Sequence, residues 1–217
     1  MELLKRKEII ENRLISYGIN NKISHLPYLE FSEDDFQTPY EVGCRILVLW
    51  AVSYLSYNLD EKAKIENWLR STVLWNKVSD HEKKLFTEEL QQKHLISFSW
   101  NIEAVVVLCW ALQLINDLPN LDGKNSAIPL DEIMDKLPIN ENPDLFLSTL
   151  SYRSKEEIFI ENITNEMITW HLRDNMLFNN KEQMKINPAI SFERHYALNW
   201  VRQFSEISDW DETDTST

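Results

Sequence analysis

The sequence predicts an all-α protein: a single compact domain of about eight or nine helices, in which amphipathic helices surround two apolar central helices. Three observations support this class. Only three of the 217 residues are glycine, whereas β-sandwiches and barrels use many glycines in their turns. Signals that begin helices recur along the chain, and two runs are apolar on nearly every face. We expect the domain to cover residues 1–205 and an acidic tail to follow over residues 206–217.

Capping sequences mark the starts of most helices. Each one places a hydroxyl or amide side chain where it can accept a hydrogen bond from the first turn, followed by proline or glutamate. The capping sequences are Thr38-Pro39-Tyr40-Glu41, Ser79-Asp80-His81-Glu82, Asn142-Pro143, Ser154-Lys155-Glu156-Glu157 and Asn187-Pro188. With the three-four spacing of apolar residues, they predict helices near 2–17, 39–58, 60–73, 79–90, 98–116, 130–136, 143–150, 154–178 and 188–205. Gly18 is expected to end the first helix in a left-handed conformation.

Two of these helices differ from the others in composition. The runs Val42–Tyr57 and Trp100–Ile115 are apolar on nearly every face, which is typical of helices buried on all sides. The other helices are amphipathic, so we expect them to pack around this central pair. The tail from Glu206 carries five acidic residues and no basic one, yet it contains Trp210, which predicts that it docks on the domain.

The charge balance favours some partners over others. The chain has 22 Lys and Arg against 35 Asp and Glu, a formal net charge of −13. Binding to nucleic acid or to an anionic membrane requires clustered basic residues, so we expect neither kind of partner. A protein partner with a basic surface remains open, and so does simple solubility, the commoner reason for an acidic surface.

The compartment expected from the sequence is the cytoplasm. The first residues are charged and contain no apolar segment like that of a signal peptide. The longest apolar runs, Ile46–Leu55 and Ala104–Leu112, are shorter than the roughly 20 residues that cross a bilayer. Cys44 and Cys109 each lie inside one of these runs, which predicts two separate buried thiols and a reducing environment.

Familiar catalytic and cofactor motifs are missing from the sequence. Three scattered glycines leave no phosphate-binding loop, and no serine sits in a glycine-flanked nucleophile elbow. The five histidines form no HExxH or ExxH pair. His171 and Asp174 lie one helical turn apart, but two ligands are too few for a metal site. We therefore expect neither a cofactor nor a metal.

The most informative feature is charge where burial is expected. Arg45 and Glu103 are the only charged residues in the two apolar helices, and their signs are opposite. A lone buried charge is costly, so each should pair with the other or with other polar groups, and we expect the direct pair. Glu193 and Arg194 likewise share helix stripes with apolar residues. Together with His171 and Arg173 they form a candidate polar cluster, which is either a set of structural ion pairs or the lining of a cavity.

An ordered series of short stretches resembles a known family. The stretches are Gly18-Ile19, Leu26-Pro27, Glu41-Val42-Gly43-Cys44-Arg45-Ile46-Leu47, Val78-Ser79-Asp80-His81-Glu82-Lys83, Ser99-Trp100-Asn101-Ile102-Glu103-Ala104, Cys109-Trp110-Ala111-Leu112, Trp170-His171-Leu172-Arg173, Glu193-Arg194-His195-Tyr196-Ala197-Leu198-Asn199-Trp200 and Asp209-Trp210-Asp211-Glu212-Thr213-Asp214-Thr215. In this order they resemble the bacterial family catalogued as domain of unknown function 4272. The likeness covers nearly the whole chain, which favours a single domain. It implies no activity, cofactor or catalytic residue.

Two classes of function are compatible with these observations. The first is a non-catalytic intracellular protein-interaction module, of an inhibitor or immunity type, which binds its partner through an acidic face. The second is an enzyme or small-molecule sensor with a polar cavity built from the candidate cluster. The sequence favours the first, because no nucleophile, metal or phosphate motif supports the second. A closed pocket in which the candidate charges converge would favour the second.

Overall fold

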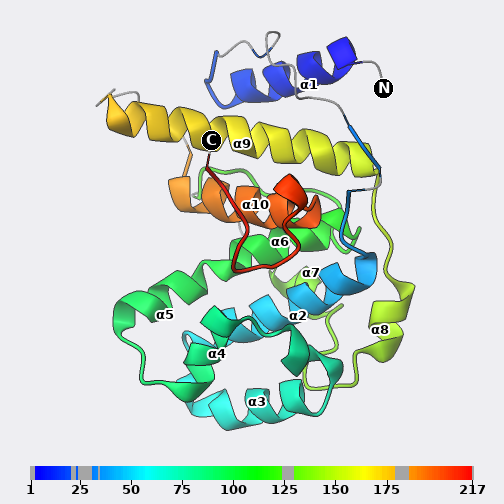
Figure 1. Cartoon of the computed structure of the whole chain (residues 1–217), viewed down its shortest axis with the longest axis vertical. Coiled ribbons are helices and arrows are strands. Elements are labelled where there is room, and N and C mark those ends of the chain that lie inside the picture. The colour runs from blue at the N-terminus through cyan, green and yellow to red at the C-terminus, as the bar shows by residue number, and fades with distance from the viewer. Residues whose placement is uncertain are drawn as a thin grey trace.

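The computed structural model describes residues 3–20, 23, 31–33, 35–123, 130–178 and 186–216 (Figure 1). Of these residues 66% are helical and none lies in a β-strand, so the predicted all-α class is confirmed. The helices, with η marking a 3-10 helix, are α1 (Leu3–Ser16), α2 (Pro39–Leu55), η1 (Leu59–Glu61), α3 (Lys62–Arg70), η2 (Val73–Lys77), α4 (Asp80–Thr87), α5 (Gln92–Ser99), α6 (Asn101–Ala111), α7 (Leu130–Met134), α8 (Asp144–Thr149), α9 (Lys155–Leu177), α10 (Pro188–Val201) and η3 (Phe204–Glu206).

The predicted capping interactions form at the helix ends. The Thr38 hydroxyl accepts a hydrogen bond from the backbone N–H of Glu41 at the start of α2. Ser79 and Glu82 form both bonds of a capping box at the start of α4. Gly18 follows α1 with φ of 83°, a conformation that suits glycine because it has no Cβ. Local sequence therefore determines where these helices begin and end.

Helices α2 and α6 form the centre of the main core, as their composition predicts. They pack against each other, and α6 also packs against α10. Nearly every residue of α2 from Val42 to Leu55 is buried, as is every residue of α6 from Glu103 to Ala111. Figure 1 shows α6 between α10 and α2, with α3 and α4 beyond α2.

Helix α9 is more deeply buried than its sequence suggests. It lies between α1 and α10 and packs against both (Figure 1). Ile163 on α9 joins Ile10 and Leu14 of α1 in a second apolar cluster. On the side of α10, the buried Asn162 amide donates to Asn199 Oδ1 at 2.7 Å. The expectation of a simple amphipathic helix is therefore wrong for the first half of α9, where several polar side chains, among them Asn162 and Thr164, are buried.

The predicted helix over residues 98–116 is divided in the structure. A separate helix, α5, ends at Ser99, and α6 runs only from Asn101 to Ala111. The start of α5 was missed because the side chain of its N-cap residue, Gln91, makes no capping hydrogen bond. Helix ends without side-chain caps have weak sequence signals.

The stretch Gln92–Ala111, which spans α5 and α6, is long and apolar enough by length and composition to cross a membrane. However, 61% of its most apolar window is buried inside the protein. The core helices of water-soluble proteins pass the same test, so this composition is weak evidence for a membrane span. Packing of α6 against α2 and α10 accounts for its apolar residues.

The C-terminal tail docks on α10, as the presence of Trp210 predicts. The Trp210 ring is buried, and its centroid lies 4.9 Å from that of Tyr196 and 5.4 Å from that of Trp200. The indole N–H of Trp200 donates to the carbonyl of Ser208 at 2.9 Å. Near the end of the tail, Arg173 on α9 donates to the carbonyl of Thr215. The tail is therefore held in place along most of its length.

Candidate functional site

Arg45 is held by three groups in the interior. Its guanidinium donates to both carboxylate oxygens of Glu82, at 2.8 and 3.0 Å, and to the carbonyl of Lys77. The ring of Trp210 covers it, with 4.9 Å between the guanidinium carbon and the ring centroid. The same Glu82 carboxylate accepts the backbone N–H of Ser79, so one side chain both caps α4 and neutralises Arg45. Arg45 thus ties α2, α4 and the tail together.

Glu103 is paired with Arg194. Arg194 donates to Glu103 Oε2 at 3.1 Å and to the carbonyl of Pro119 at 2.7 Å. Arg194 is 1% exposed and Glu103 is 4% exposed, so the pair is shielded from water. It joins α10 to α6 and to the loop that follows α6.

The expected direct pair of Arg45 and Glu103 is therefore wrong. Each residue has a different partner, because Glu82 on α4 and Arg194 on α10 lie closer to them. The general expectation that neither charge would be left without a polar partner is met. Glu82 already has a capping role in the sequence, so the sequence pattern does not indicate that it also pairs with Arg45.

The six candidate residues do not converge on one cavity. Arg173 binds the tail at Thr215, and His171 Nε2 lies 3.0 Å from the Asn175 amide. Arg45, Glu103 and Arg194 belong to the two buried ion pairs. One candidate, Glu193, lines the cavity described next. The enzyme hypothesis in which all six candidate residues line one cavity does not match this arrangement.

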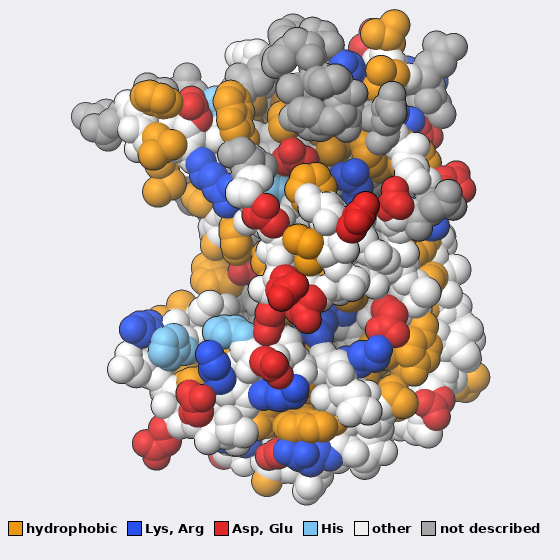
Figure 2. Space-filling view, in the orientation of Figure 1, with side chains coloured by type: hydrophobic (Ala, Val, Ile, Leu, Met, Phe, Trp, Pro, Cys, Tyr) orange, Lys and Arg blue, Asp and Glu red, His pale blue; other side chains and the backbone are white. Residues whose placement is uncertain are grey.

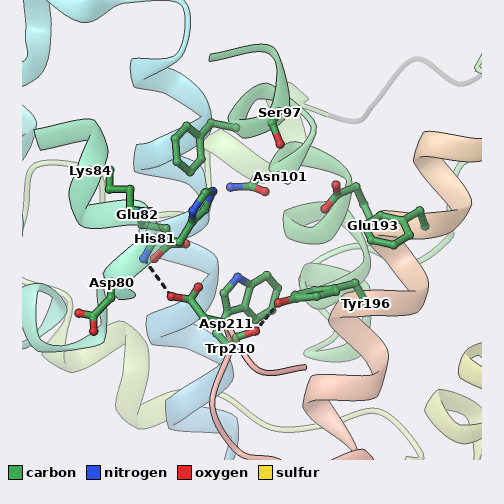
Figure 3. A pocket seen from close by; sticks show the side chains of 12 residues that line it. Asp80, His81, Glu82, Lys84, Ser97, Asn101, Glu193, Tyr196, Trp210 and Asp211 are labelled. Atoms are coloured by element: carbon green, nitrogen blue, oxygen red, sulfur yellow. Dashed lines mark hydrogen bonds between the residues drawn. The ribbon is translucent and has the colours of Figure 1, made fainter. Parts of the chain in front are cut away.

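A cavity of about 460 Å³ opens between α4, α5, α6, α10 and the tail (Figure 3). We call it the Glu193 cavity. Its lining residues come from all five elements and are Asp80, His81, Glu82, Lys84, Ser97, Phe98, Asn101, Phe192, Glu193, Tyr196, Trp210 and Asp211. In Figure 3 the His81 ring, the Asn101 amide and the Glu193 carboxylate point toward the same space from different helices.

Glu193 differs from the other acidic residues that line this cavity. Within the described part of the chain, its carboxylate has neither a hydrogen bond nor an ion pair. Burial raises the pKa of Glu193 to about 7, and the nearby negative charge of Glu103 adds to the increase. A carboxyl group with this pKa exchanges its proton near neutral pH. Both its charge and its empty hydrogen-bonding positions are therefore available to a ligand.

Aromatic rings and one carboxylate complete the walls of the cavity. His81 packs on Phe98 with 5.1 Å between ring centroids. On the opposite wall, the Tyr196 hydroxyl donates to the carbonyl of Trp210. Asp211 accepts the backbone N–H of His81 at 2.9 Å, which links the tail to α4 (Figure 3). The docked tail therefore forms one side of the cavity.

A second cavity, of similar volume, shares Asp80, Trp210 and Asp211 with the first. Its cationic residues already have partners: Lys77 pairs with Glu41 at 2.7 Å, and Lys83 pairs with Asp80 at 2.7 Å. Arg45, also on its wall, is held by Glu82. The positive charges of the second cavity are thus paired within the protein, whereas the Glu193 carboxylate has no ion pair among the described residues, and we take the Glu193 cavity as the candidate site.

Comparison with family models identifies the chain. The family described as domain of unknown function DUF4272 matches residues 6–213. The chain belongs to this family. The match covers both buried ion pairs, the Glu193 cavity and most of the tail. Comparisons with curated proteins and with solved structures give no significant match.

For this DUF4272 member, the chemistry of the site must be argued from its own residues. Among the described residues, no group of three or more His, Cys, Asp and Glu side chains is arranged to hold a metal ion. Cys44 and Cys109 are both buried, and burial raises the pKa of the Cys44 thiol to about 11. Neither thiol therefore has the depressed pKa of a reactive cysteine.

Sequence reasoning missed most of the Glu193 cavity. His81, Asn101 and Tyr196 come from three different helices, and nothing in their spacing indicates that they meet. Phe98 lies at the end of α5, whereas the sequence pattern places it at the start of a single helix over 98–116. Two signals were present in the sequence: Glu193 is a charged residue on an apolar stripe of the predicted helix 188–205, and the acidic tail contains an aromatic residue that can anchor it.

Proposed function

We propose that this protein is a non-catalytic protein-interaction module, and that it binds a basic segment of a partner protein. The observation that carries the proposal is the fixed acidic tail beside the Glu193 cavity. Glu206, Asp209, Asp211, Glu212 and Asp214 are all exposed. Because Trp210 anchors the tail, these carboxylates are presented from a defined framework instead of a moving chain end.

The surface around the tail suits such a partner. Figure 2 shows acidic side chains gathered over the tail and a hollow beside them, between α5 and α10. A negative patch of this kind attracts a basic partner over a distance of about one Debye length and speeds its association. The net charge of −13 acts in the same direction.

The test is capture of binding partners by charge-neutralised variants. The first variant combines Asp209→Asn, Asp211→Asn and Glu212→Gln, which remove three charges of the tail while keeping hydrogen-bond acceptors. The matched control combines Asp60→Asn, Asp131→Asn and Asp135→Asn, which remove three exposed charges elsewhere. Wild type and control should retain the same basic protein from a soluble extract of the source cells, as identified by mass spectrometry. The tail variant should lose it. Equal retention by all three proteins would refute the proposal.

One observation favours a second candidate, an enzyme or a small-molecule sensor. Glu193, with a pKa of about 7, could transfer protons near neutral pH, as a general acid or base does. His81 lines the same cavity. A thermal-shift screen of a metabolite library separates the two candidates. A shift caused by a small neutral or anionic molecule, and abolished by Glu193→Gln, would favour the second.

A further inference from the structure

We propose that the Glu193 cavity is a recognition pocket for one cationic side chain, lysine or arginine, of the partner. This proposal rests on the proposed interaction function and specifies its contact. Two other acidic groups at the cavity are already engaged in ion pairs: Glu82 with Arg45 and Asp80 with Lys83. Glu193 has no such partner among the described residues, so a cation supplied by a ligand would complete its interactions.

The polar groups of the cavity are positioned for a donor with several N–H groups. Ammonium and guanidinium groups carry three and five such donors respectively. Glu193 projects from α10 into the cavity, and Asp211 lies on the side formed by the tail (Figure 3). One Asp211 oxygen is used by the His81 backbone, and the other carries no hydrogen bond from the described residues. The two carboxylates thus offer acceptors on two walls.

The walls also suit the rest of a long basic side chain. Lysine and arginine carry an apolar stem behind the charged group, and aromatic rings favour both parts. Phe98 and Tyr196 provide such rings on opposite walls. The volume of about 460 Å³ lies within the range of small-ligand pockets. A neutral apolar side chain would instead leave the Glu193 carboxylate desolvated and unpaired, and an anionic side chain would meet it with like charge.

Binding should depend on pH with a defined sign. The other titratable groups that line the cavity are Asp80, His81, Glu82 and Lys84 from α4, Tyr196 from α10 and Asp211 from the tail, and the charge of Glu103 on α6 acts on Glu193 from nearby. The pKa of Glu193 is about 7, so its carboxyl is mostly protonated at pH 6 and mostly ionised at pH 8. A cation prefers the ionised form, and affinity should therefore rise between these two values. His81 lines the same cavity, and a variant must separate its effect from that of Glu193.

The experiment is an NMR titration of the full chain labelled with nitrogen-15. The probes are N-acetyl-lysine amide and N-acetyl-arginine amide. The controls are the uncharged isostere N-acetyl-norleucine amide and the anionic N-acetyl-glutamate amide. At pH 8 the two cationic probes should shift the Asn101 side-chain amide and the Trp210 indole N–H, with dissociation constants in the millimolar range. The two control probes should leave both signals in place. Equal shifts by the lysine and norleucine probes would overturn the proposal.

Three variants test the pocket itself. Glu193→Gln should weaken binding of the lysine probe about tenfold or more and abolish its pH dependence. His81→Gln keeps the backbone N–H that Asp211 accepts, and it should retain the rise in affinity from pH 6 to pH 8. Asp135→Asn, an exposed acid outside the cavity, should bind like wild type. A pH dependence that disappears with His81→Gln and persists in Glu193→Gln would refute the role given to Glu193.

The results of partner capture and probe binding together distinguish the pocket proposal from the proposed interaction function. If the tail variant loses the partner while Glu193→Gln retains it and the lysine probe does not bind, the interaction function stands and the pocket proposal fails. If the lysine probe binds through Glu193 but the tail variant retains every partner, the pocket is cation-specific and the proposed interaction function fails. Loss of the partner in both variants, together with probe binding, supports both proposals.

Discussion

The two buried ion pairs and the Glu193 cavity differ in whether their charged side chains have partners. In the interior, Arg45 is matched to Glu82 and Arg194 to Glu103, with further hydrogen bonds to backbone carbonyls. In the cavity, Glu193 lies within the influence of the Glu103 charge and has no hydrogen bond from the described residues. In the interior each of these charges has a counter-charge within hydrogen-bonding distance, whereas the half-buried Glu193 has none among the described residues.

This difference shows that the presence of an ion-pair partner, more than burial, distinguishes a structural charge from a charge that is a candidate for ligand binding. A buried charge with a partner fixes how the helices pack. Removing one member of such a pair leaves the other charge buried without a counter-charge. A partly buried charge without a partner costs stability, and a ligand can recover that cost. Both kinds of residue look the same in the sequence, as isolated charges on apolar helix faces.

The largest expected effect is at Glu82. Glu82→Gln should destabilise the protein by about 3–5 kcal/mol, because Arg45 would remain buried without a counter-charge. Arg45→Met should be less damaging, since the Glu82 carboxylate would still accept the Ser79 N–H. Urea unfolding at pH 7 of wild type and each variant measures both free energies of unfolding.

Double-mutant cycles sharpen this prediction. Arg45→Met combined with Glu82→Gln should cost clearly less than the sum of the two single changes, since the residues are in direct contact. Arg45→Met combined with Glu103→Gln should be additive within about 0.5 kcal/mol, because these residues have separate partners. Strong coupling in the second cycle would contradict the arrangement described above.

The helical class and the central helices could be predicted because their causes are local. Thr38, Ser79 and Gly18 specify helix ends through bonds to neighbouring residues. The apolar composition of α2 and α6 requires burial wherever they lie in the fold. The polar residues of α9, in contrast, are buried because α1 and α10 cover it, and that packing has no local signal.

The site could not be predicted because it depends on long-range packing. Arg45 and Glu103 were correctly singled out as charges that need partners, but the sequence does not show which elements surround them. Glu82 is 37 residues from Arg45, and Arg194 is 91 residues from Glu103. The choice of partner is set by how α4 and α10 pack on the central pair, which the spacing of residues does not specify.

The next largest effect is expected at Trp210, which joins the two regions. Its ring covers Arg45 and also packs against Tyr196 and Trp200. Trp210→Ala should destabilise the protein by about 2–4 kcal/mol and release the tail, because a large buried ring is lost. Amide hydrogen exchange of residues 206–216 should speed up markedly. Trp170→Ala on the exposed side of α9 is the matched control, with an expected change below about 0.5 kcal/mol.

The smallest effect is expected at Glu193, and its sign is opposite. The pKa of Glu193 is raised from 4.5 to about 7 in the folded protein, so the folded state binds more protons than the unfolded state between these values. The stability contributed by its protonated form is therefore complete below about pH 4.5 and is lost as pH rises through 7. The glutamine of Glu193→Gln cannot ionise, so the variant does not lose stability in this way as the pH rises. It should stabilise the protein at pH 8 by about 1–2 kcal/mol, an amount reduced by the partial exposure of the carboxyl to solvent.

This stabilisation should shrink toward zero as the pH falls to 4, because wild-type Glu193 is then protonated and resembles glutamine. Thermal or urea unfolding of both proteins across that range measures the difference. Asp135→Asn, which changes an exposed carboxylate directly after α7, serves as the control and should give a small difference across the same range. A destabilised Glu193→Gln at pH 8 would mean that the carboxylate contributes to folding. Glu193 would then belong with the interior pairs, and the contrast between the two regions would fail.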